Sequence, residues 1–482
     1  MTANVRAKSS SRGTGEIWRG PYILRNWAYF WGILLVVAWG TPNSLGVLIC
    51  GGVALHALRG PRHAVEALGI LAFLIVLGKT SISLGRWLVL FAAFGRVLWD
   101  GFLGRGTGDR SVPYFVYLLL LFYGVVLVLS LLASRFPVVS GLKVTSFTVG
   151  VGVTVTGFYR TRHLRDYWLS WLFTLAVFIL LASIPFYGLG AGYSRNGVGF
   201  QGILTHPQTF GPVLAPIAAL LTGLYFFRRR TSTVVLLCMG LGWAGMYFSL
   251  SRTSMLAAAL AGLVVVALGF AFKPDTWAVD LGRSLGRPIV VFGVFTVLTL
   301  GALQWTTLQS EFESFLAKGD GGGSLTTALE ASRGNLMDRS MANFWDHPLT
   351  GIGFGAPSDP ARFANQLERG PYGIPLSASV EKGFMPTAVL EETGLIGTTL
   401  TILLLLFLFV PILQHPDPTL FWVAAASLFV NFGEMVFFSV GGMGFFFWFV
   451  MAFCHVAALR DSGSETEPAP AERPPAYAGR GG

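Results

Sequence analysis

The polar residues of this chain that could do chemistry lie in a few short stretches between long apolar runs. One stretch, Ser249-Leu-Ser-Arg-Thr-Ser254, joins two apolar runs and carries Arg252. A serine or threonine here can cap the following helix, whose first amides already favour an anion. The guanidinium of Arg252 would add a permanent charge suited to a phosphate. The alternative is an interfacial arginine that reaches toward lipid headgroups.

A second polar stretch, Tyr193–Gln208, leads into another apolar run. Pro207 suits the first turn of a helix, which places His206 at the helix entrance. A neutral histidine there could bind a sugar hydroxyl or a phosphate oxygen. It could equally be a satisfied polar residue at the membrane boundary.

The longest polar segment covers residues 305–385, and a loop of that length in a compact protein is usually functional. Apolar residues recur at helical spacing from Leu325 to Trp345, which predicts an amphipathic helix whose apolar stripe packs against the core. Arg333 borders this stripe. Asp346–Gly355 then reads as a helix stop followed by a glycine-rich turn. It lacks the lysine and the preceding strand of a phosphate-binding loop.

The end of this loop carries a candidate general base, Glu381, near the junction with the next apolar run. Partial loss of water there favours the protonated form of a carboxyl, which suits a group that must accept a proton. The alternative is a surface glutamate paired with Lys382. Of Glu391 and Glu392, at the mouth of the next helix, we expect one to cap backbone amides or to hold an arginine.

The elements that must position these residues are membrane-spanning helices. Hydrophobic residues make up 53% of the 482 residues and charged residues 12%, about half the charged fraction of a soluble domain. Apolar runs of about 17–25 residues predict an all-α, polytopic helical membrane protein. The expected spans lie near 27–41, 44–58, 66–80, 114–134, 166–190, 207–227, 231–250, 253–272, 288–304, 394–413, 418–438 and 443–460.

Two further stretches, 83–102 and 141–158, are ambiguous, and either both span or neither does. The prediction is therefore about twelve spans, with fourteen as the alternative. Cys50, Cys238 and Cys454 all fall inside apolar runs, so we expect neither a disulfide framework nor a zinc site. No cleavable signal peptide is expected, because the first apolar run lacks a small-residue cleavage site and another follows at once.

Lysine and arginine decide the orientation, because cytoplasmic loops are enriched in them. The basic residues cluster in the N-terminal tail and at 59–63, 160–165, 228–230 and 273–287, which predicts that these segments are cytoplasmic. This placement also explains the net charge of +10 without a nucleic-acid partner. The opposite, external face receives 187–206, 249–253, 305–385 and 439–444, so the unusual polar residues share one face.

The predicted organisation has five parts. Residues 1–20 and 461–482 are expected to be disordered cytoplasmic tails, because they are rich in polar residues, and the second is also rich in proline. Residues 21–304 hold the N-terminal spans, 305–385 form the large external loop with the active-site motifs, and 386–460 hold the C-terminal spans.

Together these stretches resemble the O-antigen ligase / O-antigen polymerase (Wzy-type) superfamily of bacterial cell-surface glycosyltransferases. The matching pieces, in a common order and on one face between about residues 186 and 400, are Ser251-Arg252-Thr253, Gly202–Gly211, Arg333 followed by Asp346–Gly355, and Leu390–Gly397.

The resemblance implies a metal-independent, inverting membrane glycosyltransferase of the GT-C class, with no cofactor. Such enzymes take glycan from an undecaprenyl-diphosphate carrier at the outer, periplasmic face of the bacterial plasma (inner) membrane. Implied catalytic residues are Glu381, His206, Arg252 and Arg333. Residues implied to bind the diphosphate or glycan are Arg195, Arg252, Arg333, Arg339, His347, Lys382 and Gln208, and no metal ligand is implied.

Two departures favour a polymerase of exopolysaccharide, capsule or O-antigen over a ligase that transfers glycan to lipid A–core. The ligases carry a His-Asn pair where this chain has Gly383-Phe384. Many relatives carry an arginine where it has Gly199, and we expect Arg195 to take over the role of that arginine. The implied partners are the lipid-linked oligosaccharide, membrane lipid, a chain-length regulator and a flippase. The alternative from another functional class is a small-anion transporter. Such a protein places ionisable residues near the middle of the membrane, and Glu434 is the residue of this chain that comes nearest to that pattern.

Overall fold

The computed structural model of the protein describes residues 27–40, 45–78, 82–102, 113–194, 197–227, 233–288, 290–291, 295, 299, 334–360, 368–369, 375–377 and 382–459. The predicted tails 1–20 and 461–482, the run 289–304 for the most part, and much of the loop 305–385 lie outside these residues. The predicted helix 325–345 is described from residue 334 onward.

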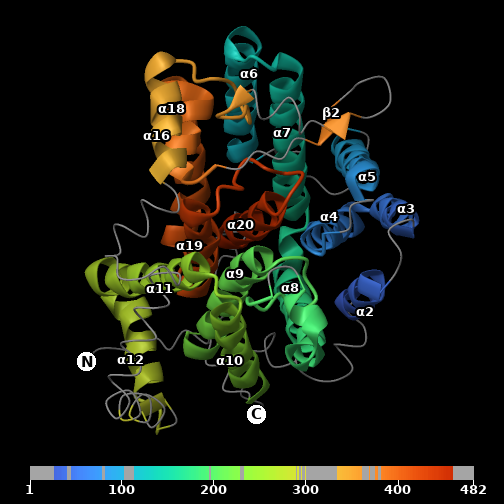
Figure 1. The fold of residues 1–482 in the computed structure, drawn as a ribbon. Helices are drawn as coiled ribbons and strands as arrows, with labels where there is room; N and C mark the ends of the chain where they lie inside the picture. Colours follow the sequence, from blue (N-terminus) through green and yellow to red (C-terminus); the bar gives the residue numbers. More distant parts are fainter. Residues whose placement is uncertain are drawn as a thin grey trace, which may run out of the picture.

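The described residues form helices and one two-stranded pair, which confirms the predicted all-α fold of a polytopic membrane protein (Figure 1). The N-terminal helices are α2 (Trp27–Gly40), α3 (Gly46–Ala57), α4 (Pro61–Val76), α5 (Ile82–Phe102), α6 (Tyr114–Ala133), α7 (Pro137–Arg160) and α8 (Arg165–Ser183). They are followed by α9 (Pro207–Phe226), α10 (Thr233–Phe248), α11 (Arg252–Phe272), α12 (Val279–Leu285), α16 (Asn335–Asp346), α18 (Met385–Gln414), α19 (Pro418–Gly433) and α20 (Gly444–Ala458). In the loop region β1 (Glu368–Arg369) pairs antiparallel with β2 (Pro375–Ser377).

Among the described residues, six helical segments are long and apolar enough to cross a membrane: Tyr114–Ala133, Pro137–Arg160, Arg162–Gly188, Pro207–Phe226, Arg252–Phe272 and Met385–Gln414. Five shorter apolar helices, α2, α3, α10, α19 and α20, accompany them. The last of the long segments begins at Met385 instead of the predicted residue 394, because a helical turn carrying Glu391 and Glu392 precedes the apolar run.

Burial separates the central helices from the peripheral ones. Helix α20 lies in the middle of the bundle, and every residue from Gly444 to Ala458 is buried (Figure 1). The apolar window of α9 is 89% buried inside the protein, whereas those of α6, α11 and α18 are 33%, 33% and 28% buried. These outer helices therefore present most of their apolar surface to the lipid that must cover it.

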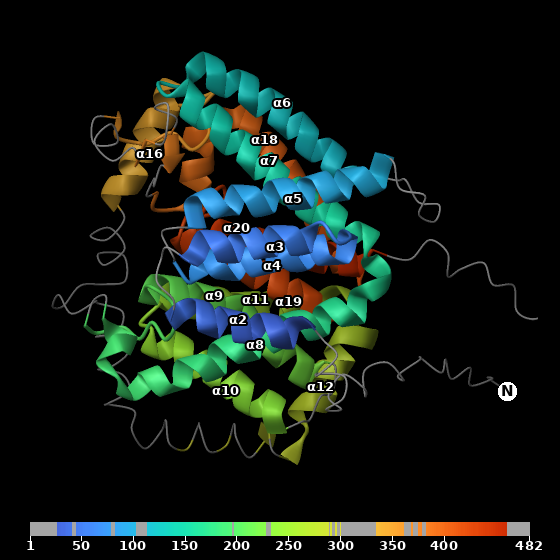
Figure 2. The same cartoon turned by 90° about the vertical axis from the view of Figure 1, so that its right-hand side faces the viewer.

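The two stretches that the sequence left ambiguous are both helices. Helix α5 packs against α3 and α4, and α7 packs against α6 and α20, so both belong to the bundle (Figure 2). Ser134 lies at the corner between α6 and α7, and Gly353 belongs to the glycine-rich turn after α16. The two residues are in contact, because a Cβ placed on Gly353 would overlap the side chain of Ser134. This contact puts the α6–α7 corner at the end of the bundle that carries α16, which we call the α16 end. That placement favours fourteen spans over twelve.

Labelling of Arg135→Cys distinguishes the two topologies. If α5 and α7 both span, Arg135 lies on the same side as α16, the external side by the lysine and arginine rule; if neither spans, it lies on the cytoplasmic side. We expect a membrane-impermeant maleimide added to intact cells to label Arg135→Cys, which is exposed in the fold. The three native cysteines are buried and give little background.

The matched control is His163→Cys, an exposed position in the basic loop before α8, which is cytoplasmic in both topologies. It should be labelled only after the cells are opened. If Arg135→Cys behaved like His163→Cys, the fourteen-span topology would be wrong.

Candidate functional site

A break in helix α18 is the centre of the α16 end. Gly394 has φ 60° and ψ −169°, outside the helical region, in the middle of an apolar helix. The segment 348–353 lies against the break and supplies backbone partners: Leu395 N donates to Pro348 O at 2.9 Å and Ile352 N donates to Glu391 O at 2.8 Å. Irregular backbone at membrane depth is tolerated where protein covers it in this way.

Glu391, just before the break, is fully buried and collects four donors. The ammonium of Lys382 lies 2.7 Å from Oε2. Ser340 and Asn343 of α16 donate at 2.8 and 2.6 Å, and Ser358 donates at 3.0 Å. A buried carboxylate is stable only when it is paired and hydrogen-bonded, and all of these partners come from the loop segment. Glu391 therefore fastens α16 and the following turn to α18.

Glu392 fastens a second part of the loop. Its Oε2 accepts a 2.7 Å hydrogen bond from the backbone N–H of Gly355, and its Oε1 lies 3.5 Å from Lys382. Lys143 of α7 donates to the carbonyl of Gly355 at 2.7 Å. Two carboxylates and two ammonium groups thus balance inside the protein. The expectation that one of the two glutamates caps backbone amides is confirmed for Glu392, while Glu391 holds a lysine instead of an arginine.

The glycine-rich turn is explained by packing, not by a phosphate. Gly351, Gly353 and Gly355 all have positive φ, and a Cβ on any of them would overlap α18, Ser134 or Lys143. The turn delivers Phe354, which is fully buried, into a cluster of aromatic rings. Its ring centroid lies 4.6 Å from that of Phe438 and 5.7 Å from that of Phe147.

Helix α16 differs from the predicted apolar stripe. Phe344 is buried, but Trp345 is 69% exposed. The buried side of α16 carries polar residues beside Phe344, because Ser340 and Asn343 bind Glu391. The buried carboxylate, which the periodicity of the loop could not reveal, decides which face of α16 is inside.

His206 lies where the sequence predicted it, at the entrance of α9. Its Nδ1 accepts a 3.0 Å hydrogen bond from Gln208 N, so the imidazole caps the first turn. The ring is half-buried, and the side chain of Gln208 is exposed. Since Nδ1 is an acceptor, a neutral His206 carries its proton on Nε2.

Arg252 is the first residue of α11 and is half-buried. The turn before it is tight: Leu250 has φ 55°, and Ser251 Oγ and Ser254 Oγ share a 2.6 Å hydrogen bond. A Cβ on Gly211 of α9 would overlap Ser251, so the starts of α9 and α11 lie side by side. The beginning of α9, which carries His206, therefore lies next to the beginning of α11, which carries Arg252.

Contacts continue from Arg252 to the Glu391 cluster. Thr253 fills the space beside Gly433 at the end of α19, where a Cβ would overlap it. Phe432, directly before Gly433 in the chain, packs its ring 5.9 Å from that of Phe384, the residue before α18. Phe384 follows Lys382 by two positions, so a chain of packed residues connects the two polar groups of the α16 end.

The remaining predicted residues fall into three groups. Arg339 forms a 3.1 Å ion pair with Asp359 in solvent, and His347 at the end of α16 is exposed. Lys382 is buried and bound to Glu391 and Glu392. Arg195, Arg333 and Glu381 lie outside the described residues, so their roles stay predictions.

Sequence reasoning missed Lys143, Ser340, Asn343 and Ser358. Lys143 is the only lysine or arginine between Pro137 and Tyr159, inside an apolar stretch, and a lone charge in a span is a signal of function or of a buried partner. Its partner is 212 residues away, at Gly355. The three polar residues of the loop carry no comparable signal.

A comparison with known protein families also points to the region of the chain that carries Arg252 and the buried glutamates. Residues 234–402 match a family model described as O-antigen ligase. The match runs from α10 to the middle of α18 and includes Arg252, the glycine-rich turn and both buried glutamates. A comparison with curated proteins gave no match.

Replacing Glu391 should be far more costly than breaking the exposed pair on the same helix. Glu391→Ala strips Lys382 of its closest partner inside the protein, and removing one member of a buried ion pair costs about 3–5 kcal/mol. Arg339→Ala breaks the exposed pair with Asp359, which is expected to cost about 0–1 kcal/mol. Thermal unfolding of the two purified variants in the same detergent measures both losses of stability. Equal unfolding temperatures for the two variants would contradict the fastening role of Glu391.

Proposed function

We propose that the protein, whose residues 234–402 match a family model described as O-antigen ligase, is an inverting glycosyltransferase that polymerises undecaprenyl-diphosphate-linked oligosaccharide units. The product is an exopolysaccharide, capsule or O-antigen. The reaction takes place at the outer, periplasmic face of the bacterial plasma membrane. The single observation that carries the proposal is the position of Arg252 at adjoining helix starts within the family-matched region.

This position suits the diphosphate of a lipid carrier. The starts of α9 and α11 are in contact at Gly211 and Ser251, so the positive ends of two helix dipoles lie near each other. Arg252 adds a permanent positive charge at that place. The α16 end is also where the polar loop meets the apolar spans, so a lipid tail in the bilayer can present its headgroup there.

The proposed chemistry needs an acid–base group and charge stabilisation on the leaving group. Glu381 removes the proton from the acceptor hydroxyl, whose oxygen forms the new bond to the anomeric carbon of the donor. The bond from that carbon to the diphosphate oxygen breaks, and the undecaprenyl diphosphate leaves with the electron pair. Arg252 and Arg333 stabilise the negative charge on it, which is the kind of electrostatic assistance that lowers such barriers most. Arg195 is proposed to assist at the diphosphate.

A polymerase is favoured over a ligase by the residues before α18. Gly383 and Phe384 stand where the ligases carry their His-Asn pair, and here Gly383 is buried and Phe384 packs on Phe432. Neither residue can accept a proton. The nearest titratable neighbour, Lys382, is engaged by two glutamates.

The proposal is tested with purified protein reconstituted with a pool of undecaprenyl-diphosphate oligosaccharide in the presence of EDTA. A ladder of lengthening lipid-linked glycans supports a metal-independent polymerase. No ladder, but transfer to added lipid A–core, would make the protein a ligase. Neither product, from folded protein with its cognate lipid, would overturn both and favour the anion transporter.

Arg252→Ala and Arg333→Ala should each abolish the ladder in this assay, because the leaving diphosphate loses a cationic partner. Both variants should insert and purify like the wild type. Arg252→Lys keeps the charge but not the fork, and it should retain only part of the rate. The matched control is Arg283→Ala, an exposed arginine on α12 at the basic end. Full-length ladders from Arg252→Ala would remove Arg252 from the site.

Glu381→Gln should lower the initial rate of chain growth by at least about 10²-fold, because a general base contributes roughly that much or more. Glu368→Gln, in strand β1 of the same loop, is the control and should keep the wild-type rate. If Glu381→Gln kept its rate, the base would have to be sought at His206 or His347, and the corresponding histidine variants would be measured next.

A further inference from the structure

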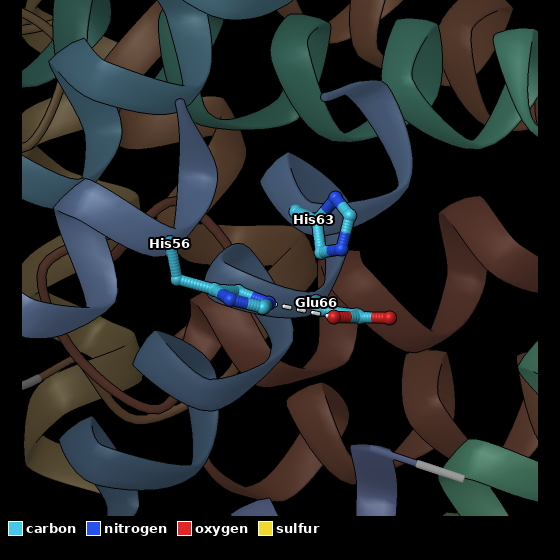
Figure 3. A group of neighbouring side chains, drawn as sticks. All are labelled: His56, His63 and Glu66. Carbon is cyan, nitrogen blue, oxygen red and sulfur yellow. Dashed lines mark hydrogen bonds and ion pairs between the residues drawn. The ribbon is translucent and has the colours of Figure 1, made fainter. Parts of the chain in front are cut away.

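A second cluster of titratable side chains lies at the other end of α3 and α4, away from the α16 end. His56 is in the last turn of α3, and His63 and Glu66 are in the first two turns of α4 (Figure 3). One ligand-type atom from each residue lies within 4.8 Å of the other two. The cluster shares this end with Arg59, Arg62 and the basic segment 160–165, so it plays no part in the chemistry proposed above.

The local chain geometry explains why the three side chains converge. His63 and Glu66 are three positions apart, so they share one face of α4. A short turn, closed by hydrogen bonds from Leu58 N to Ala54 O and from Arg59 N to His56 O, returns the chain so that α3 places His56 opposite them. The His56 and His63 rings meet edge to face with centroids 4.7 Å apart, and His56 Nε2 lies 2.7 Å from Glu66 Oε2.

The donor set is typical of zinc. Two imidazole nitrogens and one carboxylate oxygen, with a fourth position open, match the ligands and the number that Zn²⁺ takes from proteins in many sites. Tetrahedral ligands at about 2.0–2.1 Å from the metal lie roughly 3.3 Å apart. The gap between His56 Nε2 and Glu66 Oε2 therefore needs to open by a few tenths of an ångström. His63 is half-buried, so the cluster is reached from the surface side.

An outer layer of contacts already orients the proposed ligands. Glu66 is fully buried, and its second oxygen, Oε1, accepts a short hydrogen bond from the Tyr167 hydroxyl and lies 3.2 Å from Arg62 Nε. This arrangement leaves Oε2 directed at His56. The Trp31 ring packs edge-on against His56, with centroids 4.8 Å apart. Metal ligands are commonly held by such partners, which fix their orientation and raise their affinity.

The positive charge of Arg62 opposes a nearby cation, but it is compensated here. Besides its contact with Glu66, the guanidinium lies 5.2 Å from the centre of the Tyr167 ring. In this position Arg62 acts on the carboxylate oxygen that faces away from the two histidines.

We propose that His56, His63 and Glu66 bind one Zn²⁺ that ties α3 and α4 together and, through Trp31 and Tyr167, joins them to α2 and α8. The site is structural and separate from glycan transfer. Its existence does not depend on whether the protein is a polymerase, a ligase or a transporter. An ion bound there stabilises the folded chain by mass action, since the unfolded chain does not hold the three ligands together.

The test uses the full-length protein in detergent, stripped with EDTA and freed of chelator by gel filtration. Zinc chloride is titrated in against a competing zinc indicator, and thermal unfolding is followed with and without the metal. We expect one Zn²⁺ per chain and a higher unfolding temperature when it is bound. Tyr167→Phe, which removes an outer partner, should weaken binding about 10–100-fold.

His63→Gln is the decisive variant, because this half-buried side chain can be changed with little effect on packing. It should lose more affinity than Tyr167→Phe and lose the thermal shift, while unfolding like the metal-free wild type. His163→Gln, an exposed histidine at the same end, is the control and should bind as the wild type does.

Two results would overturn the proposal. One is a stripped wild-type protein that takes up no zinc at micromolar concentrations. The other is a His63→Gln protein that binds zinc as tightly as the wild type. Either result would make the cluster a hydrogen-bonded network that satisfies the buried Glu66 without a metal.

Discussion

The pairing of two buried glutamates with Lys382 around a break in α18 is the interaction on which the α16 end depends. Glu391 and Glu392 are almost completely buried in an otherwise apolar helix. They are stable there because Lys382 and donors of the loop reach them, while Lys143 holds the carbonyl of Gly355, whose N–H binds Glu392. The same contacts fix α16, the turn after it and α7 relative to α18. The two buried carboxylates, which would be unfavourable in a membrane without partners, thus attach the loop to α18.

The proposed catalytic groups are built on rigid elements as a consequence. His206 and Arg252 begin two helices whose first turns touch, and Arg252 is connected through Thr253, Gly433 and Phe384 to the α18 cluster. Sites that rest on helix ends are more precisely positioned than sites on loops. In the proposed function, the loop contributes the groups that meet the glycan, and the helix ends contribute fixed charge for the diphosphate.

The sequence predicted the fold class well, because span length and apolar composition are local properties. It also identified His206 as a helix entrance and Arg252 as a helix start. The predicted span 394–413 lies inside α18, but the helix begins nine residues earlier, at Met385, because Glu391 and Glu392 have buried partners that the sequence does not reveal. Lys143 was missed for the same reason: its partner Gly355 is far away in the sequence. The inward position of Ser340 and Asn343 on α16 likewise follows from Glu391, not from the periodicity of the loop.

The most direct test of this account is hydrogen–deuterium exchange of the amides in α16, residues 335–346, compared between the wild type and Glu391→Ala. If Glu391 fastens α16 to α18, exchange in α16 should rise strongly in the variant, while the buried helix α4 keeps its wild-type exchange. If α16 exchanged equally slowly in both proteins, the helix would be held by other contacts, and the buried pair would not be the organising feature of this end.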